Sequence, residues 1–204
     1  MVSKIFIIML TGYLIGSVSP SYLLGKWLRG IDLRNYGSGN VGATNAFRVL
    51  GTGPGVAAMV LDAVKGALAV LVAAAIWRQA YHLELVKVLG GMAAICGHNW
   101  TLFLKFKGGK GVATSAGVMG ALVPPVVIIL LVIFLIIVFL TRYVSLGSVT
   151  VAILLPFLVW LREGKGIIAY LSILVALFVV VRHIPNVKRL LAGKEHKFGV
   201  RIKI

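Results

Sequence analysis

The sequence has a single cysteine, Cys96, and only five acidic residues among its 204. One cysteine excludes a disulfide within the chain. The five acids and four histidines are scattered and form no set with the spacing of metal ligands, so we expect neither a tightly bound metal nor a cofactor. Any chemistry must therefore come from other residue types.

Charge is also scarce: 13% of the residues are charged, 60% are hydrophobic, and the mean hydropathy is +1.02. These values lie outside the usual range of soluble domains and predict an all-α protein that crosses a membrane several times. The 21 Lys and Arg give a formal charge of +16, which fits nucleic acid, anionic lipid or an anionic substrate. The hydropathy argues against nucleic acid and leaves lipid and substrate.

Six apolar runs are candidates for membrane spans. They cover residues 4–25, 55–77, 85–104, 112–140, 144–161 and 166–182. The fourth run is too long for one crossing, because its 29 residues would extend about 43 Å as a helix against a hydrocarbon core of about 30 Å. Pro124-Pro125 interrupts it, so it forms either one kinked helix or two short helices.

The distribution of basic residues favours two short helices in the 112–140 run. With the N-terminus outside, the basic loops after the first and third runs lie in the cytoplasm, as the positive-inside rule requires. Two crossings then return the basic tail to the cytoplasm, whereas one crossing leaves it outside. We therefore predict about seven transmembrane helices with the C-terminus inside. The basic residues of the tail are Lys188, Arg189, Lys194, Lys197, Arg201 and Lys203.

No internal repeat or linker divides the chain, which predicts one integral membrane domain over residues 1–204. An alternative for the first run is a signal peptide, with Lys4 in its charged region and Ser17-Val18-Ser19 as its cleavage site. Cleavage there would place the following basic loop on the wrong face, which favours a retained helix.

A polar, glycine-rich loop of residues 30–51 follows the first run. Gly37, Gly39 and Gly42 permit positive φ and expose N–H groups, as in an anion-binding nest. The donors among these glycines are Ser38, Asn40, Thr44, Asn45 and Arg48. The alternative is a flexible surface loop. The glycines also match G-x-G-x-x-G, but a predicted membrane helix precedes them where a dinucleotide site requires a strand.

A second polar stretch, residues 97–115, surrounds Lys110 with glycines. Gly108, Gly109 and Gly111 let a substrate approach Lys110, and the N-terminus of a predicted helix follows at once. We therefore predict that Lys110 binds a phosphate. The stretch is not a P-loop, because Gly111 follows Lys110 where serine or threonine is required.

Other residues of this stretch are candidates with a competing interpretation. Lys107 and His98 could contact the same anion. However, Lys105 and Lys107 also fit lysines that extend to the membrane interface, and a lone histidine at a helix end is often structural.

Three further polar groups lie in or beside the apolar runs. Ser145, His183 and Asn186 return to one face if the 112–140 run crosses twice. For Lys194, Lys197, Arg201 and Lys203 we prefer attraction to anionic lipid. Inside the second run, Asp62 and Lys65 are three residues apart and can form an ion pair. The pair either takes part in the function of the protein or is structural and ties the helix to the basic loop.

Together, GSGNVGATNAFRVLG, GHNWTLFLKFKGGKGVAT, RYVSL, and RH followed by N, RL and GKE resemble the bacterial acyl-phosphate glycerol-3-phosphate acyltransferases. The resemblance extends from Gly16-Ser17 to Glu195. It implies an enzyme of the bacterial inner membrane that transfers a fatty acyl group from acyl phosphate to the 1-hydroxyl of glycerol 3-phosphate. The products would be lysophosphatidic acid and inorganic phosphate, and the motifs would face the cytoplasm.

The resemblance also implies site residues. The phosphate-binding glycine loop of the family falls on residues 37–45 with Arg48, and its lysine motif falls on residues 107–110. The later serine, histidine and asparagine positions fall on Ser145, His183 and Asn186. There are two departures. Thr101 stands where the family often has proline, which leaves the helix end less defined, and His183-Ile184-Pro185-Asn186 replaces an H-R-E-N-like segment.

We hypothesise direct attack of glycerol 3-phosphate on acyl phosphate, which is already activated. No histidine is followed five residues later by aspartate, and no credible Ser-His-Asp set exists. The proton leaves through His183 or through a substrate phosphate oxygen. In this hypothesis the donor phosphate is bound by Lys110, Arg48 and Ser38, and the acceptor by Ser145, His183 and Asn186. The rival is a membrane transporter of phosphate or another anion, whose site would lie near mid-bilayer.

Overall fold

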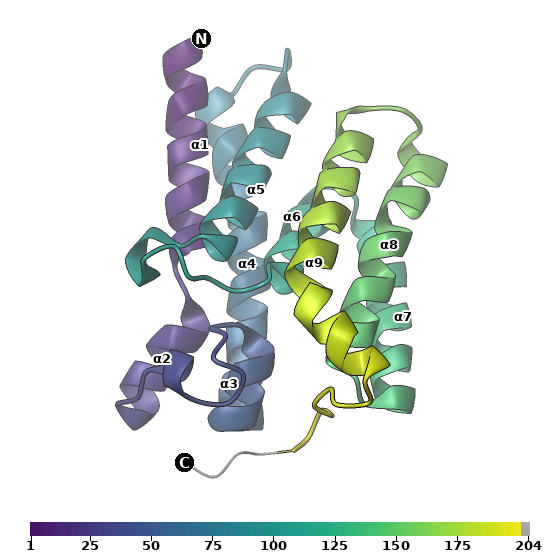
Figure 1. Cartoon of the computed structure of the whole chain (residues 1–204). Helices are drawn as coiled ribbons and strands as arrows, with labels where there is room; N and C mark the ends of the chain where they lie inside the picture. Colours follow the sequence, from purple (N-terminus) through teal and green to yellow (C-terminus); the bar gives the residue numbers. More distant parts are fainter. Residues whose placement is uncertain (201–204) are drawn as a thin grey trace. The chain divides into compact units, whose positions relative to one another are not determined.

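The computed structural model describes residues 1–200 and contains, within them, nine α-helices and two short 3₁₀-helices (Figure 1). The α-helices are α1 (Val2–Ser17), α2 (Pro20–Arg29), α3 (Ala43–Val49), α4 (Thr52–Trp77), α5 (Leu83–Asn99), α6 (Val112–Leu122), α7 (Pro124–Thr141), α8 (Val144–Glu163) and α9 (Ile167–Leu191). The 3₁₀-helices are η1 (Leu33–Asn35) and η2 (Leu102–Leu104). The predicted all-α class is confirmed. Arg201 and Lys203, which we assigned to a lipid-attracted tail, lie outside the described residues.

Five stretches within residues 1–200 are long and apolar enough to cross a membrane. They are Val2–Arg29, α4, α7, α8 and α9. Helices α5 and α6, with 17 and 11 residues, are too short to belong to this set. The predicted count of seven crossings includes these two helices and stays a prediction.

The 112–140 run forms two helices, as predicted. Helix α6 ends at Leu122 and α7 begins at Pro124, with Val123 as its N-cap. Proline is favoured in the first turn of a helix because that turn does not use its N–H groups, and its fixed φ suits the helix. Pro124 also disfavours helical backbone at Val123, the residue before it, and this separates the two helices.

The first apolar run is divided in a way that we did not predict. We expected one helix over residues 4–25, but α1 ends at Ser17 and α2 begins at Pro20, with extended backbone at Val18 and Ser19. Pro20 causes this break by the same restriction on its preceding residue. The Val18 carbonyl accepts a hydrogen bond from Lys65 Nζ (2.6 Å) and the Ser17 carbonyl accepts one from Thr101 Oγ1 (2.5 Å). The segment that we considered as a cleavage site is therefore bonded into the structure.

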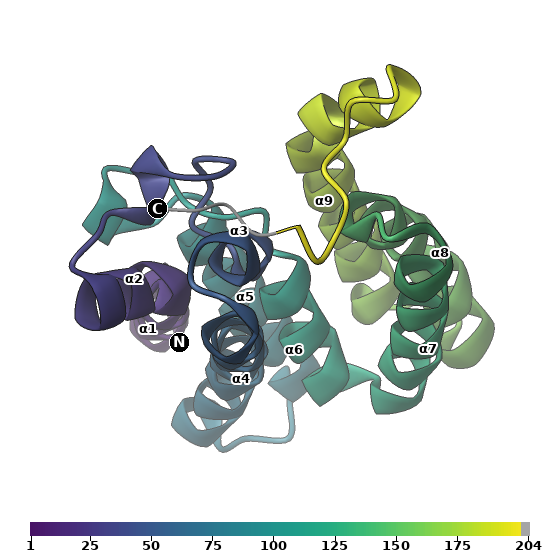
Figure 2. The same ribbon diagram turned by 90° about the horizontal axis from the view of Figure 1, so that it is seen from below.

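The chain forms two compact units, residues 1–122 and residues 123–200, and each is described by itself. Unit 1 contains α1 to α6. Unit 2 contains α7, α8 and α9, of which α8 packs against both others (Figure 2). One integral membrane domain over residues 1–204 stays a prediction.

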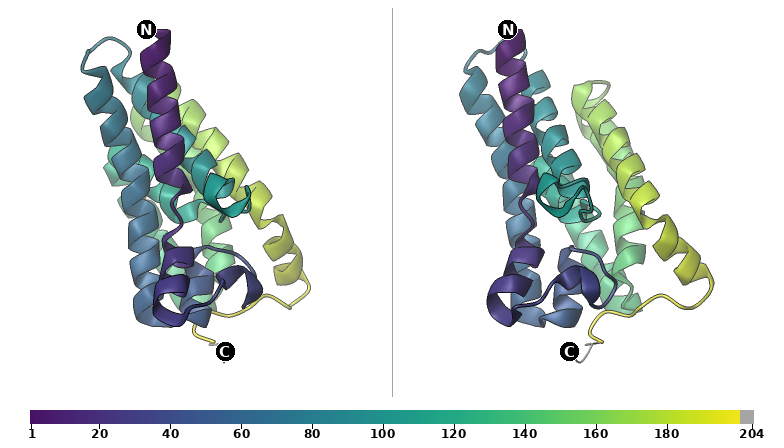
Figure 3. Two further views of the ribbon diagram at one scale, coloured as in Figure 1. Left: turned by 90° about the vertical axis from the view of Figure 1, so that its left-hand side faces the viewer. Right: turned by 60° about the vertical axis from the view of Figure 1, so that its left-hand side comes forward.

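Small residues bring the helices of unit 1 close together. Helix α1 packs on α5, where a Cβ on Gly16 would overlap the backbone of Ala94. Helix α6 packs on α4, where a Cβ on Gly117 would overlap the carbonyl of Ala63. Close backbone approach through small residues is typical of membrane helices, which gain little from burying apolar side chains away from lipid. Figure 3 shows α2 and α3 gathered around the N-terminal end of α4.

This packing predicts a large effect of a single methyl group at Gly117. Gly117→Ala forces α6 away from α4 and is expected to destabilise the protein by about 1–3 kcal/mol. Gly53→Ala is the matched control, because a Cβ at Gly53 meets nothing within 4 Å. Melting of both purified variants in detergent measures the difference, and equal melting temperatures would contradict the α4–α6 contact.

Candidate active site

The glycine loop of unit 1 turns sharply at two of its three predicted glycines. Gly37 and Gly39 have φ of +63° and +69°, a region that favours glycine. Gly42 differs from the prediction: its φ is −89°, and it caps the start of α3. The N–H of Gly42 donates to Asn40 Oδ1 (2.9 Å), so this group stabilises the loop. The predicted nest therefore involves Gly37 and Gly39 only.

Asn45 holds this loop together from inside. Its side chain, 1% exposed, accepts a hydrogen bond from the Ser38 N–H (2.9 Å). Its amide donates to the carbonyls of Leu33 (3.2 Å) and Tyr36 (3.0 Å). A Cβ on Gly37 would overlap Asn45 Oδ1, which explains the glycine there. The amide of Asn45 is thus used by the loop backbone, and its predicted contact with a substrate stays a prediction.

The remaining donors of the loop stand at its surface and on α3. Ser38 is exposed, whereas Thr44 and Arg48 are half-buried. Thr44 and Arg48 are four residues apart on α3 and share one of its faces. The structure thus presents a hydroxyl and a guanidinium together beside the glycine turns.

Arg34, at the other end of the loop, is committed to an acid. Its Nη2 lies 2.6 Å from Asp32 Oδ2, and Asp32 also caps η1 by accepting from the Arg34 N–H (3.0 Å). These contacts hold the pKa of Asp32 below its ordinary value. Arg34 therefore closes a turn of the chain, and we do not add it to the candidate site.

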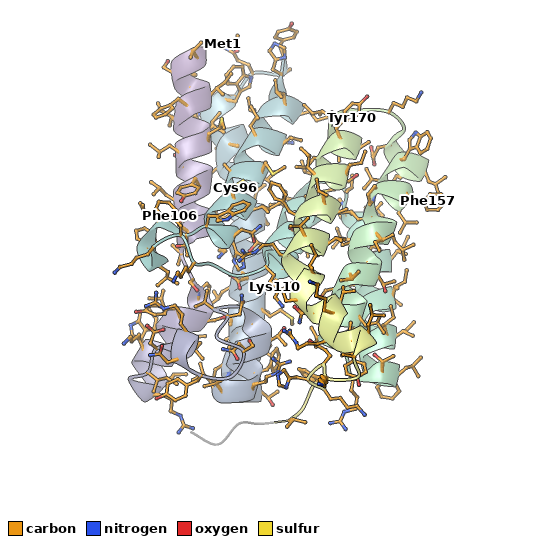
Figure 4. The ribbon with its side chains drawn as sticks, in the orientation of Figure 1. Met1, Cys96, Phe106, Lys110, Phe157 and Tyr170 are labelled. Atoms are coloured by element: carbon orange, nitrogen blue, oxygen red, sulfur yellow. The ribbon has the colours of Figure 1, made fainter. Side chains whose placement is uncertain are left out.

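The second candidate element is the segment of residues 105–111 between η2 and α6 (Figure 4). The N–H groups of Gly108 and Gly109 donate to the carbonyls of Asn99 (3.2 Å) and His98 (3.0 Å). Gly111 has a φ of +79°, and α6 begins one residue later. Lys110 is half-buried, whereas Lys105 and Lys107 are exposed. The prediction that a helix begins directly after the glycines is confirmed.

Thr101 defines the end of α5 more firmly than we predicted. Its φ of −65° and ψ of 128° are angles that proline favours, so threonine holds a proline-like backbone at this position. Its hydroxyl also bonds to the Ser17 carbonyl. This bond links the start of η2 to the end of α1.

In unit 2, two predicted site residues meet at one carboxylate. Glu195 Oε1 accepts hydrogen bonds from Ser145 Oγ (3.1 Å) and Asn186 Nδ2 (2.7 Å). Glu195 Oε2 accepts from Arg189 Nε (2.7 Å). Sequence reasoning placed Glu195 only at the end of the GKE motif. The one sequence feature that could have drawn attention to Glu195 is the scarcity of acids, since it is one of only five in the chain.

Glu195 is expected to make unit 2 sensitive to acid. Burial raises the pKa of this carboxyl, but hydrogen bonds from Asn186 and Arg189, the charge of Arg189 and the bond from Ser145 outweigh burial and hold the pKa below its ordinary value. A lowered pKa in the folded state gives stability that is complete above the ordinary value and is lost as pH falls through the lower one. Melting temperatures measured from about pH 6 to about pH 3 should therefore fall more steeply for the wild type than for Glu195→Gln. Parallel curves would refute this role, and Glu163→Gln, whose side chain is 39% exposed, is the control.

His183 lies one turn before Asn186 on α9 and is buried. Its Nδ1 is 2.8 Å from the Val179 carbonyl. A carbonyl only accepts hydrogen bonds, so Nδ1 carries a proton, and the neutral ring then has its lone pair on Nε2. Pro185 leaves the Val181 carbonyl without its helical donor, and Figure 1 shows α9 bending in this half.

The described part of the chain provides no group of three or more His, Cys, Asp or Glu side chains that could hold a metal. What it provides are cations, amides, hydroxyls and backbone N–H groups. Such groups bind phosphate oxygens and neutralise negative charge.

The sequence matches the model of a known family, described as glycerol-3-phosphate acyltransferase, over residues 6–193. The chain belongs to the glycerol-3-phosphate acyltransferase family. Its relatives include the glycerol-3-phosphate acyltransferase 2 of Moorella thermoacetica, 44% identical over 95% of this chain and 97% of that protein. The glycerol-3-phosphate acyltransferase of Shouchella clausii is 45% identical over 98% of each chain.

Solved structures agree with this assignment. The acyltransferase is similar to the crystal structure of PlsY, an integral membrane glycerol 3-phosphate acyltransferase, in its glycerol 3-phosphate form. The TM-score is 0.88, with 37% identity and 96% of each chain covered. A second crystal structure, the lysophosphatidic acid form, gives a TM-score of 0.85 and 36% identity over 96% of this chain and 95% of that one.

These likenesses confirm the predicted family, its enzymatic class and its multi-pass membrane character. The particular roles of Lys110, Arg48, Ser38 and His183 stay predictions. So do the predicted substrate contacts of the glycine loop, His98, Lys107, Ser145 and Asn186.

Proposed function

We propose that the protein transfers a fatty acyl group from acyl phosphate to the 1-hydroxyl of glycerol 3-phosphate. The observation that carries the proposal is the likeness to PlsY, whose two crystal structures are described by an acceptor, glycerol 3-phosphate, and a product, lysophosphatidic acid. The choice of acyl phosphate as donor is supported by the residues themselves. The described residues offer phosphate-binding groups, and the sequence has no credible Ser-His-Asp set.

The reaction exchanges one bond for another at the acyl carbonyl carbon. The glycerol 1-oxygen forms a bond to this carbon, and the bond from the carbon to the phosphate oxygen breaks. Phosphate leaves with the bonding electrons, and the hydroxyl proton goes to His183 Nε2 or to a substrate phosphate oxygen. Positioned cations accelerate such a step because they neutralise charge on the departing phosphate.

The groups proposed for the donor phosphate belong to unit 1. Lys110 supplies a positive charge that is half-buried between glycines. Arg48 supplies a planar guanidinium, which can bind two phosphate oxygens at once. Ser38 adds a hydroxyl between Gly37 and Gly39 in the glycine loop.

The groups proposed for the acceptor belong to unit 2. Glu195 fixes Ser145 and Asn186, so their remaining hydrogen-bonding capacity is held in a defined direction. His183 follows the same helix face as Asn186, three residues earlier. Its Nδ1–H is used by Val179, so Nε2 is the ring nitrogen that would take the hydroxyl proton if the proton leaves through His183.

We further propose that the protein lies in the bacterial cytoplasmic membrane with its motifs in the cytoplasm, its N-terminus outside and its C-terminus inside. The positive-inside rule supports this orientation. The exposed apolar side chains of α7, including Phe139 at 84% exposed, suit contact with lipid. A fusion of an enzyme active only in the cytoplasm to the C-terminus tests the orientation, which an inactive fusion would contradict.

A purified preparation tests the reaction itself. Detergent-solubilised protein should release phosphate and form lysophosphatidic acid in equal amounts when acyl phosphate and glycerol 3-phosphate are both present. Phosphate uptake into vesicles without acyl transfer would instead favour the transporter. Binding of lipid with neither phosphate uptake nor acyl transfer would favour a non-catalytic lipid-binding protein.

A further inference from the structure

Three ionisable side chains meet inside unit 1. Lys65 Nζ lies 2.7 Å from Asp62 Oδ1 and 3.0 Å from His98 Nδ1. The same Nζ donates to the Val18 carbonyl (2.6 Å). All three side chains are buried, with residue exposures of 2% for Asp62, 7% for Lys65 and 6% for His98. The predicted ion pair between Asp62 and Lys65 is thus confirmed, and it extends to His98.

The geometry fixes the orientation of the histidine. A lysine ammonium has only N–H donors, and Lys65 Nζ contacts the Val18 carbonyl, the Asp62 carboxylate and His98 Nδ1. His98 Nδ1 also lies 3.3 Å from Asp62 Oδ1, so the Nδ1 edge of the ring faces both members of the ion pair. Burial of the two charges is compensated in part because they are paired with each other.

The other edge of the His98 ring faces the loop that carries Lys110. A Cβ on Gly109 would overlap His98 Nε2, so the ring and the loop backbone are in close contact. The N–H of Gly109 also donates to the His98 carbonyl (3.0 Å). Both the side chain and the backbone of His98 thus define the path of the chain one residue before Lys110.

We propose that Asp62, Lys65 and His98 form a positioning network that sets the location of Lys110 through His98 and Gly109. Asp62 and Lys65 hold the ring by its Nδ1 edge, and the Nε2 edge supports the glycine loop. The proposal rests on the proposed function of Lys110 as a ligand of the donor phosphate. It gives His98 a role through Lys110, in place of the substrate contact that the sequence suggested.

His98→Asn is the sharpest variant, because its shorter amide can still accept from Lys65 but cannot reach Gly109. We expect kcat/KM for acyl phosphate to fall about 10-fold to 100-fold, since displacements of about 1 Å have effects of this size. The KM for glycerol 3-phosphate should not change. His98→Gln, whose amide reaches the position of Nε2, should recover part of the loss. His82→Asn, an exposed histidine with φ of +61°, is the matched control.

A double-mutant cycle between His98→Asn and Lys110→Ala decides whether the effect passes through Lys110. We expect His98→Asn to change kcat/KM less than about twofold when Lys110 is already alanine. A full 10-fold to 100-fold loss in that background would overturn the positioning role and leave the proposed function intact. Wild-type kcat/KM for Lys110→Ala alone would overturn both assignments.

Lys65→Met tests the other end of the network, because it removes the ammonium group beside His98 Nδ1. In protein that elutes as a single folded species, this variant should show the same kinetic losses as His98→Asn. Unchanged kinetics would overturn the network.

Discussion

Replacement of Lys110 by alanine is expected to lower kcat/KM for acyl phosphate by about 10²–10³-fold, the usual loss when one group that stabilises developing charge is removed. Lys110 is half-buried and stands between Gly109 and Gly111, directly before α6. It is therefore placed to interact with a phosphate that gains charge as it departs. Initial rates of phosphate release by the purified variant, over a range of acyl phosphate concentrations, measure the loss.

Lys105→Ala is the control for Lys110→Ala. Lys105 lies five residues earlier, is exposed, and fits a lysine at the membrane interface. It should retain kcat/KM within about threefold, because exposed charges contribute little. Equal losses in the two variants would show a general effect of positive charge and contradict the specific role of Lys110.

Replacement of His183 by asparagine is expected to lower kcat by about 10²–10⁴-fold, the range for loss of a general base. The asparagine amide can still donate to the Val179 carbonyl, as Nδ1 does now (2.8 Å), so the local helix should remain intact. The variant removes Nε2 and its lone pair. Turnover at saturating concentrations of both substrates is the quantity to measure.

The same variant distinguishes the two routes for the proton. If a substrate phosphate oxygen takes it, His183→Asn keeps kcat within about tenfold of the wild type. The KM for glycerol 3-phosphate then reports any loss of binding. Ser172→Ala, a buried hydroxyl on the same helix that bonds only locally to the Ala169 carbonyl (2.6 Å), controls for damage to α9.

Helix breaks could be predicted where length and proline acted together. The 112–140 run was too long for one crossing, so Pro124 was the natural division. The first run had an ordinary length, and its apolar character continues through Val18 to Leu24. Pro20 therefore gave a weaker signal there, although its effect on the preceding residue is the same.

The glycine loop shows what pattern alone does not determine. Three glycines in G-x-G-x-x-G permit positive φ, but only Gly37 and Gly39 adopt it. Gly42 is extended because it starts α3 and bonds to Asn40. Whether an amide such as Asn45 faces a ligand or the loop depends on partners that are up to twelve residues away.

Glu195 was missed for the same reason. Its partners Ser145 and Asn186 are fifty and nine residues distant, so no local spacing reveals the contact. The family resemblance identified Ser145 and Asn186, and the fold of unit 2 then brought them to one carboxylate. Tertiary contacts of this kind require the structure.

The central claim of this account is that the protein supplies positioned cations, hydrogen-bond donors and a base, and that no residue becomes acylated. Rapid-quench measurement of phosphate release from acyl phosphate alone tests it most directly. Without glycerol 3-phosphate the account predicts no burst, and addition of glycerol 3-phosphate should start steady release at once. A burst of about one phosphate per enzyme, with a protein mass increased by one acyl group, would contradict the account.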